Sequence, residues 1–301
     1  MNVLVFSHYF ELAKELISAG SRVGDVSLLL SSDQRDREGE VKGARRVIIC
    51  DVSSEDQSGL LNAITSLAKD YDLLIFSSDK RGRELIGQVA QKLERAVATE
   101  VSSLSLSNGK LIIERMTYGG KAISVEELSL PAAISIQKGK FKPLDADSAH
   151  ETLHCKFEAA RSYEVVERRP KPKLGIPLDK ADVVVAAGRG FKRKEDLKLA
   201  QELAELFNGV VGSTRPLAAD LKWVPEESWI GISGVRIAPK LLFVVGASGQ
   251  QQFSAGIIDS KVIVAINNDP GAPIFENSDY GIVKDLYEFL PALIKRLREL
   301  R

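Results

Sequence analysis

Hydrophobic positions in the second half of the chain fall into short continuous runs, and each run ends in a turn of glycine, hydroxyl or amide residues. Four such runs lie at residues 181–187, 209–212, 241–245 and 261–266. Continuous runs rich in β-branched residues and bounded by turn residues are typical of strands buried on both faces of a parallel sheet. In such sheets a ligand binds in the crevice outside the carboxyl ends of the strands. Because these four ends carry small and polar residues, the pattern predicts a nucleotide-sized ligand there.

The first half of the chain alternates apolar runs with segments of helical spacing. Strands are predicted at residues 2–6, 25–30, 45–50, 72–76, 111–116 and 133–137, and helices at 11–19, 60–68 and 85–93. This alternation predicts a second parallel α/β sheet. The segment Ser107–Gly109 predicts a hairpin turn before the strand at 111–116. No phosphate-loop signature occurs in this half, and His8 is interpreted as a solvated turn residue after the first strand.

A charged, proline-interrupted segment, Arg168–Lys173, separates the two halves and cannot continue a helix. We therefore predict an α/β protein of two doubly wound, mainly parallel-sheet domains, the second of which binds the ligand. The first domain spans residues 1–177, with a connector from about residue 157, and the second spans 178–301. Helices of the second domain are predicted at 194–207, 248–255 and 283–301, the last of them kinked or divided at Pro291.

Composition narrows the class of protein. The chain has 301 residues, 44% of them hydrophobic, and its 41 basic side chains balance 41 acidic ones. A balanced charge argues against nucleic-acid binding and against a polybasic membrane-binding surface. Cys50 and Cys155 lie far apart in the sequence, which disfavours a disulfide framework or a zinc site. Since we find no membrane-length apolar run and no amino-terminal leader, we expect a cytoplasmic protein without membrane insertion.

Two turns in the second half are candidates for binding phosphate groups. Gly188–Gly190 begins like a dinucleotide fingerprint, but Arg193 stands where the third glycine would be. Gly246–Gly249 lies at the start of a predicted helix, whose unpaired N–H groups would hold a pyrophosphate, although no Gly-Lys-Ser/Thr follows as in a Walker loop. Arg189 and Arg215 would be costly to bury without an anionic partner. The second half contains no histidine or cysteine, so a cofactor is expected to carry any chemistry.

At these residues the sequence resembles the alpha subunit of electron transfer flavoprotein. The blocks that carry the resemblance lie in this order within residues 181–290: GRGFKRKEDLKLAQELAE, GSTRPLAAD, WIGISG, LLFVVGASGQQQFSAG, DSKVIVAINNDPGAPIF and DYGIVKDL. Residues 1–140 match more loosely, at 81–93, 98–101 and 115–120.

The resemblance implies a heterodimer with an electron transfer flavoprotein beta subunit, and FAD held mainly by the second domain. It implies a set of residues that line the FAD site: Gly188, Arg189, Gly190, Thr214, Arg215, Ile230, Gly231, Ile232, Ser233, Ser248, Gly249, Gln250, Gln251, Gln252, Phe253, Asn267, Asp285 and Leu286. Arg215 and Ser233 would lie nearest to the isoalloxazine ring and tune the flavin. Phe253 stands where a histidine is frequent in the family, and Asn268 where a lysine is common, which leaves their effect on the flavin potential open.

Two functions remain open. The first is an electron carrier rather than an enzyme with its own substrate, taking electrons from dehydrogenases and passing them to an acceptor such as a quinone oxidoreductase or a ferredoxin. This electron-carrier function is compatible with a place in a bifurcating NADH-dependent complex. The second is a nicotinamide-dependent oxidoreductase, which the incomplete glycine fingerprint and the lack of a proton donor near the crevice disfavour. The identity of the donors and acceptor, and whether the beta subunit carries AMP or a second, bifurcating FAD, depend on other chains.

Overall fold

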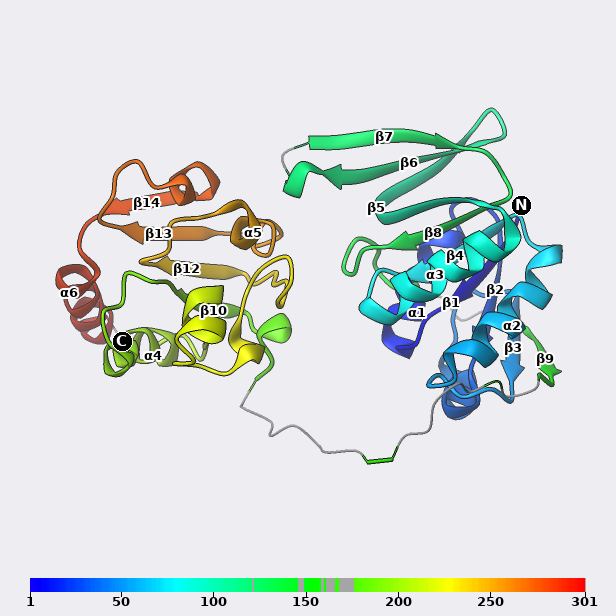
Figure 1. Ribbon diagram of the computed structural model, residues 1–301, viewed down its shortest axis with the longest axis horizontal. Helices are drawn as coiled ribbons and strands as arrows, with labels where there is room; N and C mark the ends of the chain where they lie inside the picture. The colour runs from blue at the N-terminus through cyan, green and yellow to red at the C-terminus, as the bar shows by residue number, and fades with distance from the viewer. Residues whose placement is uncertain (121, 146–148, 158–159, 161–165, 168–175, 301) are drawn as a thin grey trace. The chain divides into compact units, whose positions relative to one another are not determined.

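The computed structural model of the protein describes residues 1–120, 122–145, 149–157, 160, 166–167 and 176–300 (Figure 1). The chain divides into two compact units, Met1–Arg168 and Arg169–Arg301, which we call unit 1 and unit 2. The charged connector Arg168–Lys173 lies outside the described residues, so the domain boundary between residues 177 and 178 stays a prediction.

Unit 1 is built on a nine-stranded sheet with the strand order β7-β6-β5-β8-β4-β1-β2-β3-β9. Its strands are β1 (Asn2–Phe6), β2 (Asp25–Leu30), β3 (Arg46–Cys50), β4 (Leu73–Ser77), β5 (Ala96–Ser107), β6 (Lys110–Thr117), β7 (Ala122–Leu128), β8 (Ala132–Ile136) and β9 (Glu151–Cys155). The strands from β8 to β9 pair in parallel, and β5 joins β8 in parallel. Strands β6 and β7 extend the sheet by antiparallel pairing.

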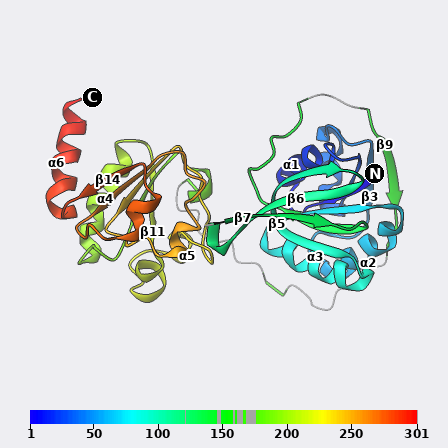
Figure 2. The same cartoon turned by 90° about the horizontal axis from the view of Figure 1, so that it is seen from above.

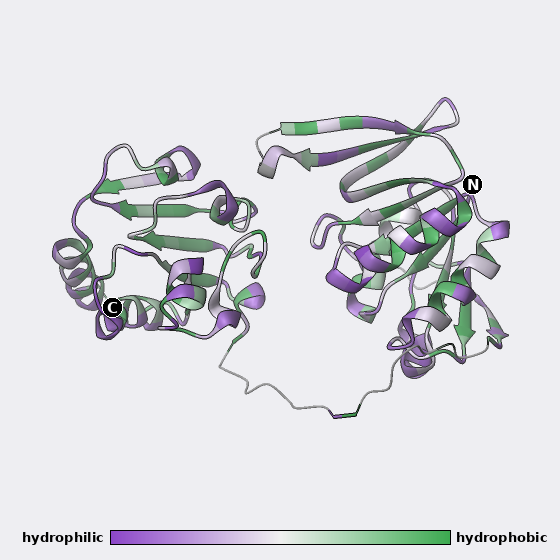
Figure 3. Cartoon of the chain, viewed as in Figure 1, coloured by the Kyte–Doolittle hydropathy of each residue, from purple (hydrophilic) through white to green (hydrophobic). Residues whose placement is uncertain are grey.

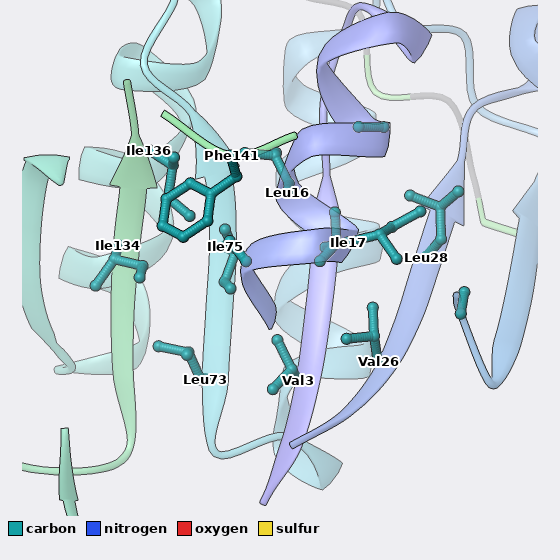
Figure 4. Close-up of a cluster of buried hydrophobic side chains, with 14 of the residues drawn as sticks. Val3, Leu16, Ile17, Val26, Leu28, Leu73, Ile75, Ile134, Ile136 and Phe141 are labelled. Carbon is teal, nitrogen blue, oxygen red and sulfur yellow. The ribbon is translucent and has the colours of Figure 1, made fainter. Parts of the chain in front are cut away.

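Helices cover both faces of the unit 1 sheet. Helix α1 (Phe10–Gly20) packs on one face, and α2 (Gln57–Leu67) and α3 (Lys80–Leu93) pack on the other (Figure 2). Side chains of the central strands alternate between the two cores, so Val3 lies in the core under α1 and Leu4 in the core under α2 and α3. Figure 4 shows the first core, in which Leu16 and Ile17 of α1 gather with apolar side chains of the strands.

The predicted strands and helices of the first half are all present, with end points shifted by a few residues. The predicted hairpin lies between β5 and β6, where Asn108 and Gly109 have φ of 49° and 77°. The pattern missed β5, β7 and β9. In these strands polar residues interrupt the apolar ones, so they lack the continuous apolar run that revealed the others.

Unit 2 contains a five-stranded parallel sheet with the order β11-β10-β12-β13-β14. Its strands are β10 (Val183–Ala187), β11 (Val210–Ser213), β12 (Leu241–Val245), β13 (Ile263–Asn267) and β14 (Tyr280–Val283). Helices α4 (Lys198–Glu205) and α6 (Leu286–Glu299) cover one face, and α5 (Gln251–Ser254) packs on the other. The strands of this sheet are mainly hydrophobic and the helices mix both kinds of residue (Figure 3). Both units therefore confirm the predicted α/β class with mainly parallel sheets.

Three details of unit 2 differ from the prediction. The last helix begins at Leu286 rather than Val283, and it continues through Pro291 without being divided. The preceding residues form β14, an edge strand that is largely exposed and so has no apolar run. The helix predicted to open at Ser248 begins only at Gln251, because Gly249 has a left-handed φ of 79° and Gln250 an extended ψ of 146°. No helix in the described part of the chain is long and apolar enough to span a bilayer.

Candidate functional site

The site lies where the chain order of the unit 2 strands reverses. Strand β10 is followed in the chain by β11 on one side and by β12 on the other, so the carboxyl ends of β10 and β12 form a topological switch point. The turns after the two strands pack together: the N–H of Gly188 donates to Val245 O and that of Gly190 to Gly246 O, both at 2.8 Å. A Cβ on Gly188 would lie 2.4 Å from Gly246 O. Position 188 thus needs glycine so that the two turns can touch.

Two adjoining cavities follow this edge. The larger, of about 430 Å³, is lined by Arg189, Thr214, Arg215, Pro216, Trp229, Ile230, Ile232, Ser233, Ala247, Ser248, Gly249, Gln250, Gln252 and Phe253. The second, of about 340 Å³, is lined by Arg189, Gly190, Lys192, Gly246, Ser248, Ile266, Asn267, Asn268, Lys284, Asp285 and Leu286. Both cavities are lined by Arg189 and Ser248, so a single elongated ligand could occupy both. Their volumes are in the usual range of small-molecule sites.

The loop after β12 offers backbone donors to this crevice. The N–H groups of Ser248, Gly249 and Gln250 have no acceptor among the described residues. Because α5 is a single turn, the helix dipole contributes less here than the sequence suggested, and the loop N–H groups are the main attraction for an anion. A Cβ on Gly249 would meet the Ile274 backbone nitrogen at 2.4 Å, so this glycine keeps the loop against its neighbour.

The hydroxyl of Thr214 is a further donor of the larger cavity. The residue is 8% exposed, and its Oγ1 is buried without a hydrogen-bond partner among the described residues. Its backbone N–H donates to Ala187 O at 2.9 Å, which fixes the residue beside the end of β10. A buried unsatisfied hydroxyl costs about 1–3 kcal/mol, so the position favours a ligand that supplies a partner.

Two arginines without a carboxylate partner border the larger cavity. Neither Arg189 nor Arg215 is in an ion pair with any described residue, and both are exposed. In the chain by itself neither guanidinium is buried, so the cost of burying an unpaired arginine does not arise. The guanidinium of Arg215 lies over the Trp229 ring, with Cζ 5.5 Å from the ring centroid. The larger cavity thus combines unpaired positive charge with apolar walls.

Several side chains of the second cavity hold its walls in place. Asn267 donates from Nδ2 to Ala247 O at 2.9 Å and accepts the Asp269 N–H at 3.0 Å, so it ties the end of β13 to the loop after β12. Asp285 accepts the N–H of Tyr287 at 2.7 Å and caps α6. Both residues are therefore positioned by the fold and act on the shape of the crevice.

The loop that carries Arg189 is anchored to α6 by Tyr287. The Tyr287 hydroxyl accepts the Lys192 N–H and donates to Asp196, both at 2.7 Å. This hydrogen bond holds the pKa of Asp196 below its ordinary value, whereas burial is the main cause that raises the pKa of Tyr287. The contacts fix the carboxyl-terminal part of the loop, at Lys192 and Asp196, independently of any ligand.

The structure brings most of the sequence-predicted residues to these two cavities. Three of them line neither cavity: Gly188, Gly231 and Gln251. Phe253 is 6% exposed and packs in the core, so it offers a phenyl edge and no hydrogen bond to the larger cavity. The sequence interpretation missed several lining residues: Lys192, Pro216, Trp229, Ile266 and Lys284. Trp229 was detectable, since it precedes the Ile230–Gly234 turn directly. Among the described residues, no cluster of His, Cys, Asp and Glu is arranged to hold a metal ion.

Comparison with known proteins finds matches for both units. Residues 10–168 match the family model described as Electron transfer flavoprotein domain, and residues 177–258 match the one described as Electron transfer flavoprotein FAD-binding domain. The chain is 37% identical over 242 residues to YdiR of Escherichia coli strain K12, named as an electron transfer flavoprotein subunit, covering 78% of this chain and 77% of YdiR. It is 35% identical over 247 residues to the protein FixB of Escherichia coli strain K12 / DH10B, covering 81% of this chain and 79% of FixB.

Proposed function

The chain belongs to the electron transfer flavoprotein family as an alpha-type subunit, and from this premise we propose that it carries electrons on an FAD bound along the carboxyl edge of unit 2. The cofactor of the matched domain is FAD. FAD bound there would supply the redox chemistry, and the chain would carry electrons from a dehydrogenase to a downstream acceptor. The residues of the chain hold and orient the flavin, and they set the electrostatic field around it.

The observation that carries this proposal is the row of unsatisfied donors along one continuous crevice. The N–H groups of Ser248–Gln250 are suited to the pyrophosphate, because backbone N–H groups in a turn bind anions. The larger cavity, with Trp229, Ile230 and Phe253, is suited to the flat isoalloxazine ring. The second cavity is then left for the adenosine. In this arrangement Arg215 and Ser233 would lie on the flavin side of the crevice and Asp285 and Leu286 on the adenosine side.

We further propose that an electron transfer flavoprotein beta subunit covers part of this crevice. In the chain alone, Ile232 is 47% exposed, and Arg189, Arg215 and Ser233 are exposed as well. A flavin bound against these residues would keep part of its surface in water, and a partner that covers that surface would strengthen binding by burying it. The chain alone is therefore expected to hold FAD weakly.

Co-expression with a beta subunit tests both proposals. The purified heterodimer should show a yellow flavin spectrum, with one FAD assigned to the crevice of unit 2 by loss on Gly249→Val. The chain purified alone should lose FAD on desalting. A monomer that keeps its full FAD content would contradict the role of the partner, and a colourless heterodimer would contradict FAD binding. A colourless chain that binds NAD would support the nicotinamide-dependent alternative instead.

A further inference from the structure

Trp229 forms part of the wall of the larger cavity. Its own backbone N–H and carbonyl groups both form hydrogen bonds that hold it in place. Its N–H donates to Glu226 O at 3.0 Å, and its carbonyl accepts the Val235 N–H at 2.7 Å. The next residue, Ile230, donates to Ser213 O at 2.9 Å and so attaches this segment to the end of β11. The position of the tryptophan is therefore set by the sheet rather than by a mobile loop.

The ring itself rests on a glycine of the following turn. A Cβ on Gly234 would lie 3.0 Å from Trp229 Cγ and 2.3 Å from Trp229 O. Any larger residue at this position would have to displace the tryptophan. The turn thus packs against the indole. The ring can still contact a side chain from the end of the neighbouring strand.

That side chain is Arg215, which begins the π-helical turn Pro216–Asp220 after β11. Its Cζ lies 5.5 Å from the Trp229 ring centroid, within the range of a cation–π contact. Three other arginines of unit 2 are held by carboxylates: Arg193 by Asp196, Arg296 by Glu299 and Arg298 by Glu202. Arg215 has no carboxylate in ion-pair distance within the described part of the chain. An aromatic ring can orient a guanidinium without neutralising its charge, whereas a carboxylate would cancel it.

We propose that Trp229 is a positioning residue that holds the Arg215 guanidinium toward the flavin with its positive charge intact. This inference rests on the proposed function, because it assigns the larger cavity to the isoalloxazine ring. A fixed cation near the ring favours the forms of the flavin that carry more negative charge. The contribution of Arg215 to the flavin reduction potential therefore depends on Trp229.

The test uses the FAD-loaded heterodimer and measures the midpoint potential of the bound flavin. Trp229→Leu removes the aromatic ring and should lower the midpoint potential. The decrease should be more than half of the decrease caused by Arg215→Ala. Trp229→Phe keeps a weaker aromatic face, so its potential should lie between those of wild type and Trp229→Leu. If the leucine variant does not retain FAD, the midpoint potential of the phenylalanine variant is the deciding measurement. Trp223→Leu is the matched control, because Trp223 is partly buried in the other core of unit 2 and should leave the potential unchanged.

A double-variant cycle separates positioning from a general effect on packing. In an Arg215→Ala background, Trp229→Leu should add no further shift, because there is no guanidinium left to hold. An unchanged potential in both Trp229 variants, or an equal shift with and without Arg215, would overturn the inference while FAD binding stands. A wild-type heterodimer without FAD would overturn the proposed function together with it.

Discussion

The two sheets of this protein share a parallel topology with a switch point, yet their carboxyl edges differ in which hydrogen-bonding groups remain free. In unit 1 the switch point lies between β1 and β4, and the side chains at the carboxyl ends of these strands form hydrogen bonds with one another and with β8. Ser7 and Ser77 share a hydrogen bond of 3.0 Å across it, and Ser78 bonds Ser135 at 2.7 Å. The helix that follows β4 is capped by Asp79, which accepts the N–H groups of Arg81 and Gly82.

Among the described residues, the buried side-chain atoms left without a partner at this edge of unit 1 are acceptors. His8 is 7% exposed, and its Nε2 bonds Gln57 Oε1 at 3.1 Å, so Nε2 carries the proton and the unpartnered Nδ1 is an acceptor. The other unpartnered atom is the carbonyl oxygen of Gln137. The expectation that His8 is a solvated turn residue was therefore wrong, because tertiary packing buries it.

In unit 2 the groups left over are donors: the Thr214 hydroxyl, the loop N–H groups of Ser248–Gln250, and the guanidinium groups of Arg189 and Arg215. An anionic cofactor needs donors, and the second edge combines a buried hydroxyl, three consecutive loop N–H groups and two guanidinium groups, which suits a pyrophosphate. The comparison shows that strand topology brings polar groups to an edge, whereas the balance of satisfied and free donors decides what the edge can bind.

The largest expected effect follows from changing the donor loop itself. Gly249→Val should abolish FAD retention, because a side chain at φ of 79° is strained and its Cβ would meet the Ile274 backbone at 2.4 Å. Strain of this kind costs about 1–3 kcal/mol, and if the loop moves out of its binding position to relieve it, FAD affinity should fall about fivefold to 150-fold. FAD content after desalting is the measurement, with circular dichroism as a check on the fold. The control is Gly271→Ala, where the nearest atom to a Cβ lies at 3.4 Å. Full FAD content in Gly249→Val would show that the phosphates bind elsewhere.

The second effect concerns the Arg215 guanidinium, which has no carboxylate partner among the described residues. Arg215→Ala should lower the flavin reduction potential, because it removes a cation from the wall of the larger cavity. At an effective dielectric near 20 a charge about 4 Å away contributes roughly 4 kcal/mol, and exposure to solvent reduces this. If about 1.4 kcal/mol persists, the one-electron potential falls by about 59 mV. The potential of Arg215→Lys should lie between those of Arg215→Ala and wild type. Arg298→Ala, which removes an arginine paired with Glu202, should leave it unchanged, and equal shifts in both alanine variants would refute a local effect.

A smaller effect is expected at the free hydroxyl. Thr214→Val removes the unsatisfied Oγ1 with little change in shape, so the protein without FAD should be as stable as wild type or more so. FAD affinity should fall about threefold to tenfold, as expected for the loss of one hydrogen bond of about 0.5–1.5 kcal/mol. Thermal unfolding and FAD titration measure the two quantities, and Thr214→Ser should retain the affinity. A loss of stability without loss of affinity would mean that the hydroxyl serves the fold.

The smallest effect is expected at His8, at the carboxyl edge of the unit 1 sheet. Burial lowers the pKa of His8 below its ordinary value of 6.5, so the folded state favours the neutral ring. Below that value the unfolded chain binds the proton more readily, and the free energy of unfolding of unit 1 should fall as the pH falls. Hydrogen exchange of the β1 and β4 amides at about pH 7.5 and 5.5 measures it. His8→Asn should reduce this pH dependence, whereas substituting the exposed His154 in the same way should not. Equal pH dependence in wild type and His8→Asn would assign the effect to other groups.

The sequence by itself determined the strands with continuous apolar runs, the hairpin at Asn108-Gly109 and the glycine turns at the carboxyl edge of unit 2. These features depend on local physics, since side-chain periodicity and turn chemistry act over a few residues. The family blocks also pointed to FAD and to most of the residues that line the two cavities.

Only the tertiary structure decided which strands are neighbours and which polar groups stay free. Cys50 and Cys155, far apart in the chain, are register partners on β3 and β9. Strand β14 exists through its pairing with β13, because its own residues are largely exposed. The contact of Arg215 with Trp229 and the burial of His8 likewise join residues from different elements. Such features depend on strand order and packing across the whole sheet, which no local pattern of residues encodes.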